Sequence, residues 1–190
     1  LFSTLQLIYE DDFDGEFNKD FWEIRQSGKW IVKDGKMTGT ESPIEYQQKM
    51  IAKKDSHTGE WPIIRLNKIP AEFICHMRVK YGGKEYAKNR PLLDVGHHKN
   101  SFLFSAKSTR LLVDKTKFRE MRQGCLLPLN QWLDITIELK NGKLAMGING
   151  KTEVYENENI SMHGHSEFTF KGISHGKLIF DSVKLWELKR

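Results

Sequence analysis

The densest collection of reactive side chains in the sequence is the segment Asp94-Val95-Gly96-His97-His98-Lys99-Asn100. A histidine can act as an acid or a base near neutral pH. On a regular strand adjacent histidines point to opposite faces, so at most one of the two would join Asp94 on a given side. A glycine between them and the aspartate would let the backbone approach a ligand closely. The alternative interpretation is a polar strand end that leads into a turn.

A second group of candidates lies on a strand that alternating apolar residues predict over positions 73–79. Its polar positions carry His76 and Arg78. Arg78 could pair with a carboxylate or hydroxyl of a ligand, while a histidine supplies acid or base chemistry. Alternatively, the two side chains are only the polar face of an amphipathic strand.

Aromatic and basic residues complete the candidate set. Trp61 stands in a predicted loop beside Pro62, and an indole ring packs well on the C–H face of a sugar. Arg119 and Arg122 could line the same groove, or they could belong to a charged edge strand that discourages aggregation. The predicted ligand-binding residues are Trp61, His76, Arg78, Asp94, His97, Arg119 and Arg122.

Metal and disulfide chemistry have weaker support. His163-x-His165 could place two imidazoles on one strand face, but it lacks a nearby third ligand and is interpreted as a polar loop. A calcium site built from Asp11, Asp12, Asp14 and Asp181 is conceivable, and no other cofactor is expected. The two cysteines, Cys75 and Cys125, cannot form a disulfide framework; a buried free thiol at Cys75 is favoured over a single bridge.

The bulk properties indicate one globular domain spanning residues 1–190. Apolar residues make up 38% of the chain, and no apolar stretch is long enough to cross a membrane. The net charge of +5 could favour anionic glycans or nucleic acid, but the basic residues are scattered, so nucleic acid is not the expected partner. The oligomeric state stays open.

Period-two alternation recurs along the chain, while helical periodicity is almost absent. Residues 133–139 alternate apolar and polar, and Asn141-Gly142 and Asn149-Gly150 are strong hairpin turns. These features predict a three-stranded meander over residues 133–155. Many short strands with frequent turns predict an all-β, two-sheet antiparallel sandwich.

The order of motifs resembles a known superfamily. Asp11-Asp12-Phe13-Asp14-Gly15 precedes Trp30-Ile31-Val32-Lys33-Asp34-Gly35, Asn130-Gln131-Trp132 follows, and Phe180-Asp181-Ser182-Val183 closes the chain. This succession resembles the concanavalin A-like lectin/glucanase superfamily, and within it most resembles the 3-keto-disaccharide hydrolase domain family of secreted bacterial proteins. The resemblance implies a jelly roll whose concave face binds sugar, in an extracytoplasmic protein.

The sequence departs from the catalytic patterns of these relatives. Leu93–His98 replaces the Asn-Ser-Gly of the hydrolase family, and Asp134–Glu138 lacks the first carboxylate of the laminarinase Glu/Asp/Glu motif because Trp132 stands there. Catalytic residues therefore remain unassigned. The expected function is a module that binds or cleaves a poly- or oligosaccharide; the alternative is a non-catalytic protein-interaction or adhesion sandwich.

Overall fold

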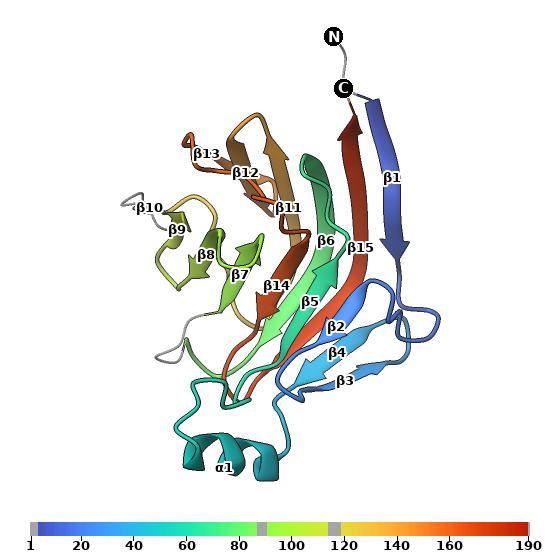
Figure 1. Cartoon of the computed structure of the whole chain (residues 1–190), viewed down its shortest axis with the longest axis vertical. Helices are drawn as coiled ribbons and strands as arrows, with labels where there is room; N and C mark the ends of the chain where they lie inside the picture. Colours follow the sequence, from blue (N-terminus) through green and yellow to red (C-terminus); the bar gives the residue numbers. More distant parts are fainter. Residues whose placement is uncertain (1–3, 87–90, 114–118, 190) are drawn as a thin grey trace.

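The described residues form a sandwich of two antiparallel sheets with a short helix at its end (Figure 1). The computed structural model describes residues 4–86, 91–113 and 119–189 of the chain, with the side chain of Arg119 left out. All strand pairs in these ranges are antiparallel. The predicted fold class is confirmed, including its jelly-roll character.

The first sheet has eight strands in the order β13-β12-β11-β6-β15-β4-β3, and β1 also pairs with β15. Its strands are β1 (Thr4–Asp11), β3 (Lys29–Val32), β4 (Met37–Thr40), β6 (Phe73–Gly82), β11 (Trp132–Lys140), β12 (Lys143–Ile148), β13 (Lys151–Glu156) and β15 (Lys177–Lys189).

The second sheet has seven strands in the order β10-β9-β8-β7-β14-β5-β2. Its strands are β2 (Trp22–Ile24), β5 (Ile63–Asn67), β7 (Leu92–Val95), β8 (Asn100–Phe104), β9 (Thr109–Val113), β10 (Arg119–Arg122) and β14 (Glu167–Lys171). Strand β14 comes late in the chain but lies in the middle of this sheet, between β7 and β5.

The meander β11-β12-β13 forms as its turn residues predict. Asn141 and Gly142 have φ of 49° and 71°, and Asn149 and Gly150 have φ of 50° and 80°. Both central positions of each turn are therefore left-handed, the geometry that an Asn-Gly hairpin favours. Two predicted turns thus fix the register of three strands.

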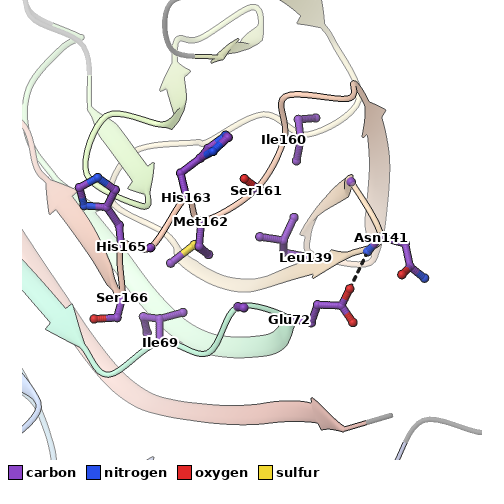
Figure 2. Close-up of a pocket in the computed structure, with 13 residues that line it drawn as sticks. Ile69, Glu72, Leu139, Asn141, Ile160, Ser161, Met162, His163, His165 and Ser166 are labelled. Carbon is purple, nitrogen blue, oxygen red and sulfur yellow. Dashed lines mark hydrogen bonds between the residues drawn. The ribbon is translucent and has the colours of Figure 1, made fainter.

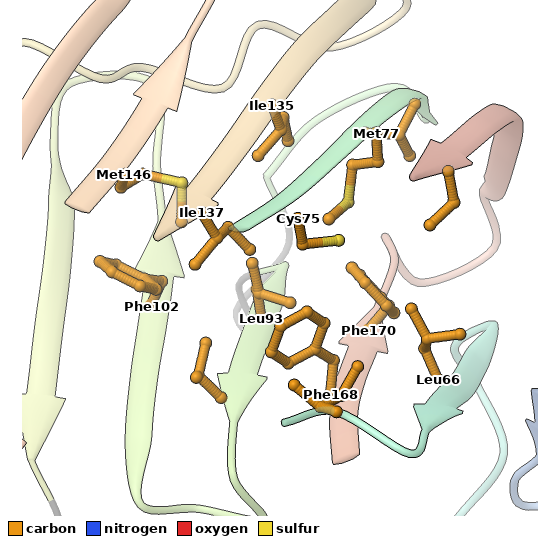
Figure 3. Packing of buried hydrophobic residues seen from close by; sticks show 14 of the residues in the cluster. Leu66, Cys75, Met77, Leu93, Phe102, Ile135, Ile137, Met146, Phe168 and Phe170 are labelled. Atoms are coloured by element: carbon orange, nitrogen blue, oxygen red, sulfur yellow. The ribbon is translucent and has the colours of Figure 1, made fainter. Parts of the chain in front are cut away.

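The core lies between the sheets (Figure 3). Cys75 and Ile137 of the first sheet face Leu93, Phe168 and Phe170 of the second, and all five are at most 1% exposed. Alternate residues of each strand supply this layer, so the remaining positions of the same strands point outward. The inward set fixes the fold and the outward set is available for function.

Both cysteines are free thiols and both are buried. The predicted free thiol at Cys75 is confirmed, and the alternative of a bridge to Cys125 is wrong. Complete burial raises the pKa of the Cys75 thiol, because the thiolate would lose its hydration. Cys125 instead directs its sulfur at backbone oxygens of Met146 and Lys151.

Helix α1 (Ile44–Ala52) is absent from the sequence-based expectation, which contained no helix. Its buried residue is Gln47, whose amide donates a hydrogen bond of 2.8 Å to the carbonyl oxygen of Ser42. Ile44 and Ile51 are exposed, so the helix lacks the apolar stripe by which a sequence reveals one. No helix in the described part of the chain is long and apolar enough to cross a bilayer.

Candidate functional site

A pocket of about 450 Å³ opens on the outer face of the seven-stranded sheet. It lies over β5, β14 and β7, whose inward residues Leu66, Phe168, Phe170 and Leu93 belong to the core. The outward residues of the same strands therefore form its floor. The side chains that line the pocket and enter the following argument are Arg25, Trp61, Arg65, Asp94, His97, His98, Thr169 and Lys171.

Strand pairing aligns five polar residues in one row across the sheet. Glu23 of β2 pairs with Arg65, Arg65 with Thr169, Thr169 with Asp94, and Asp94 with Ser101 of β8. Arg65 donates from Nε to Thr169 Oγ1 over 3.3 Å, and the Ser101 hydroxyl donates to Asp94 Oδ1. The row is therefore cross-linked by its own side chains.

Asp94 is a fully buried carboxylate in this row, with no exposed surface. Oδ1 accepts the hydrogen bond of Ser101. Oδ2 lies 2.9 Å from His98 Nδ1, close enough for an ion pair, but the contact lacks hydrogen-bond alignment. Among the described residues Oδ2 therefore has no hydrogen-bond partner, which leaves a buried acceptor unfilled.

The two histidines follow β7 on a left-handed turn. Gly96, His97 and His98 have φ of 78°, 37° and 67°. Residues other than glycine rarely adopt this region, and such strain is concentrated at functional sites. Because β7 ends at Val95, the alternation of a strand does not apply, and both imidazoles line the pocket with ring centroids 4.8 Å apart. The prediction that at most one histidine would join Asp94 assumed a regular strand, and it fails here because both histidines lie on the turn after β7.

Arg65 sets the protonation of His97. Its Nη2 lies 2.8 Å from His97 Nδ1. A guanidinium can only donate, so Nδ1 accepts and the hydrogen of the neutral ring sits on Nε2. The pKa of His97 is lowered chiefly by burial and further by the charge of Arg65. Both influences favour the neutral ring, whose Nε2 can donate a hydrogen bond.

Lys171 and Trp61 form one wall of the pocket. The ammonium of Lys171 lies 4.0 Å from the centroid of the Trp61 ring, a cation–π arrangement. Trp61 is only 7% exposed, so the expected open stacking platform is instead a buried ring with a cation over it. Burial lowers the pKa of Lys171, while Asp94 and Glu60 act in the opposite direction.

A second pocket, of about 440 Å³, is lined by His165 (Figure 2), whose ring centroid lies 5.6 Å from that of His97 in the first pocket. His163 and His165 come from the loop that precedes β14, as expected of a polar loop. His165 lies 3.7 Å from Glu167 Oε1, and His97 approaches the same oxygen at 3.8 Å. Glu167 therefore lies between two imidazoles that border different pockets.

His76 and Arg78 lie on the opposite outer face of the sandwich, on β6 of the eight-stranded sheet. Arg78 forms ion pairs with Asp134 at 3.3 Å and Asp181 at 3.6 Å, and its guanidinium lies 5.8 Å from the Trp132 ring. The structure therefore does not bring these two predicted binding residues to the pocket. Arg78 belongs to a solvated ion-pair network, and His76 lies on the same outer face.

Arg122 of β10, one of the two predicted arginines, does not join the pocket. Arg122 bonds Glu120 and lies over the ring of Tyr155, a residue of β13 in the other sheet. The side chain of Arg119 lies outside the described part of the chain. Of the seven predicted residues, the structure gathers Trp61, Asp94 and His97.

Sequence reasoning missed Arg65, Thr169 and Lys171. Their alternation with core residues is visible in Ile63–Asn67 and Glu167–Lys171. Their convergence depends on the pairing of β5 with β14, and Arg65 and Thr169 are 104 residues apart. A local pattern carries no information on such a pairing.

Within the described ranges no group of three or more His, Cys, Asp or Glu side chains is arranged to hold a metal ion. Asp11 and Asp12 accept hydrogen bonds from the backbone amides of Phe13 and Asp14, and Asp181 pairs with Lys36 and Arg78. The calcium site suggested by the sequence stays a prediction.

Comparison with known proteins identifies the fold and leaves the family open. No family model matches the sequence, and no curated protein matches it. Solved structures do match over nearly the whole chain, at identities that show the fold alone. The concanavalin A-like jelly roll is thereby confirmed, whereas the finer resemblance to the 3-keto-disaccharide hydrolase domain family is not.

Three of these structures illustrate the range of the matches. The CBM2 module of the evolved Dit of Lactobacillus casei BL23 phage J-1 has 13% identity and a TM-score of 0.64, over 100% of this chain and 99% of that one. The catalytic domain of an endo-1,3-beta-glucanase (laminarinase) from Thermotoga petrophila RKU-1 has 10% identity and a TM-score of 0.62, over 99% and 100%. The exoplasmic/lumenal domain of VIP36, in a Ca2+/Man3GlcNAc-bound form, has 8% identity and a TM-score of 0.60, over 97% and 92%.

Proposed function

We propose that this protein binds a carbohydrate chain in the pocket over β5, β14 and β7. The observation that carries the proposal is the unfilled acceptor of Asp94, a fully buried carboxylate at the pocket. A sugar hydroxyl can donate to this oxygen once the exposed His98 side chain moves aside. The outward row of Arg65, Thr169 and Ser101 offers further donors and acceptors beside it.

The neighbouring structures support this class of ligand. Their names include a glucanase and a mannose-containing complex, and they share the sandwich in which the pocket is set. An extracytoplasmic location is part of the same proposal, because glycan chains of this kind are met mainly outside the cytoplasm. Among the described residues none of the large exposed apolar side chains lines the pocket, which does not favour the adhesion alternative there. They are Leu5, Leu7, Ile24, Ile31, Ile44, Ile51, Met121 and Val154.

Asp94→Asn tests the proposal, since it keeps the shape of the side chain and removes the carboxylate charge. Binding is measured on an array of poly- and oligosaccharides, with calorimetry for each positive ligand. We expect Asp94→Asn to weaken glycan binding at least tenfold. Asp134→Asn is the matched control, because Asp134 lies on the opposite face in the ion pair with Arg78. A wild-type protein that binds no glycan on the array would refute the proposal.

Cleavage of the bound chain is a second candidate function, favoured by the contact between Asp94 and His98. Asp94 Oδ2 lies 2.9 Å from His98 Nδ1 without hydrogen-bond alignment, and a small turn of the ring would align a hydrogen on Nδ1 with the carboxylate and leave Nε2 able to accept a proton. Mass spectrometry of glycans incubated with the protein tests this function. New products that disappear in His98→Gln would establish cleavage, whereas intact glycans would leave binding alone.

A further inference from the structure

Lys171 carries a partly buried charge that no carboxylate in the described part of the chain contacts. It points outward from the centre of the seven-stranded sheet into the pocket, with its ammonium over the Trp61 ring. Among the described residues no carboxylate lies within ion-pair distance of it. The cation–π contact offsets only part of the hydration that the ammonium loses on burial.

The two carboxylates that act on the pKa of Lys171 are engaged elsewhere. Asp94 accepts from Ser101 and faces His98, and Glu60 accepts a hydrogen bond of 2.9 Å from the hydroxyl of Thr58. Both act on Lys171 through space, and burial remains the largest influence on its pKa. The ammonium therefore retains hydrogen-bonding capacity directed at the pocket.

The pocket as a whole carries more positive than negative charge. Three basic side chains line it, Arg25, Arg65 and Lys171, against the single carboxylate of Asp94. Glu23, beside the pocket, forms a 2.5 Å ion pair with Arg25 and lies 3.7 Å from Arg65. Lys171 is thus the lining cation whose charge is least compensated.

Strand register places a second cation near it. Lys171 lies two residues from Thr169 on the outward side of β14, and Thr169 pairs with Arg65 on β5. The two cationic side chains are therefore diagonal neighbours on one face, a separation that long side chains can bridge. One negatively charged group could contact both.

We propose that the ligand is an acidic sugar whose carboxylate or sulfate group is the counter-ion of Lys171. This inference rests on the proposed carbohydrate-binding function and adds the chemical class of the ligand. The anion binds the ammonium on the side away from Trp61, and the neighbouring guanidinium of Arg65 strengthens the contact. A neutral sugar leaves the buried charge uncompensated, so the pocket discriminates against it.

Calorimetry with paired glycans tests the inference. The acidic ligands are oligomers of galacturonate and alginate and a sulfated galactan, and each is paired with its carboxyl-reduced or desulfated counterpart. We expect at least one acidic ligand to bind ten times more tightly than its neutral counterpart, with affinity falling as salt is added. The uronate and sulfate arms distinguish the two sources of the anion.

Lys171→Met locates the preference. The variant keeps the unbranched stem over Trp61 and removes the charge. We expect it to lose at least tenfold in affinity for the acidic glycan while binding the neutral counterpart within twofold of wild type. Lys151→Met is the matched control, because Lys151 is an exposed lysine at the start of β13 in the other sheet. Thermal melting followed by circular dichroism verifies that both variants fold.

Each result has a defined meaning. Equal binding of acidic and neutral glycans would overturn this inference and leave the proposed function standing, whereas no glycan binding at all would overturn both. Equal losses in Lys171→Met and Lys151→Met would show that net charge is responsible, and the inference would fail. So would binding of a single-stranded oligonucleotide as tight as that of the best acidic glycan.

Discussion

Arg65 Nη2 lies 2.8 Å from Nδ1 of His97, and this contact connects the polar row of the seven-stranded sheet to the histidine turn above it. The guanidinium comes from β5, and the imidazole from the turn that follows β7. The contact holds His97 in the tautomer with its hydrogen on Nε2. The orientation of His97 on its left-handed turn therefore depends on Arg65 of strand β5.

Replacing Arg65 will change the protonation of His97. In Arg65→Gln the second-largest influence that lowers the pKa of His97 is removed, while burial remains. We expect the pKa of His97 to rise toward its ordinary value without reaching it, as measured by an NMR titration of its Cε1 proton. Arg122→Gln, beside Tyr155 in the region between β10 and β13, is the control and will leave this titration unchanged.

Stability will fall as the solution becomes mildly acidic, in part because of His97. Its pKa is lowered in the folded state, so the unfolded chain takes up the proton first as the pH falls through about 6.5. The contribution is complete above that pH and is lost below it. Chemical unfolding at a series of pH values will show a shallower fall in free energy for His97→Gln than for the wild type. Identical slopes would contradict this account.

Gly39 of β4 allows close packing of the Trp30 ring. Trp30 of β3 pairs directly with Gly39, and its ring lies over the glycine. A Cβ at position 39 would therefore overlap three carbons of the indole. We expect Gly39→Ala to cost about 1–3 kcal/mol of unfolding free energy through overpacking. Gly15→Ala is the control, since a Cβ there meets nothing within 4 Å and the backbone is not left-handed. Its effect should stay within about 0.5 kcal/mol.

The two thiols will be unreactive in the folded protein. Cys75 and Cys125 have no exposed surface, and burial raises the pKa of both. Ellman's reagent should detect almost no thiol in native buffer and two per chain in denaturant. Fast reaction of the native protein would show that one of the thiols is accessible.

The parts of the fold that could be predicted are those in which neighbouring residues specify geometry. Asn141-Gly142 and Asn149-Gly150 determine two hairpins, because both positions of each turn adopt positive φ. Alternation identified strands such as β6 and β11 and their inward residues. Helix α1 was missed because it carries no apolar stripe.

The candidate site could be predicted only where its residues are neighbours in sequence. Asp94 and His97 stood out because they are close together in a polar segment. The alternating pattern around His76 and Arg78 correctly predicted that both side chains point outward. It could not predict which of the two sheets their strand belongs to. Long-range pairing makes that choice, and it also brings β14 between β5 and β7.

Each central strand has an inward side that packs the core and an outward side that can face a ligand. Selection for stability therefore acts on one set of residues and selection for binding on the other. Substitutions of Arg65, Thr169 or Lys171 alter the chemistry presented to a ligand while the phenylalanines beneath continue to hold the layers together. Such a scaffold can change its specificity in small steps without passing through unfolded intermediates. Structures with 8–13% identity can therefore retain the same architecture while their sequences diverge.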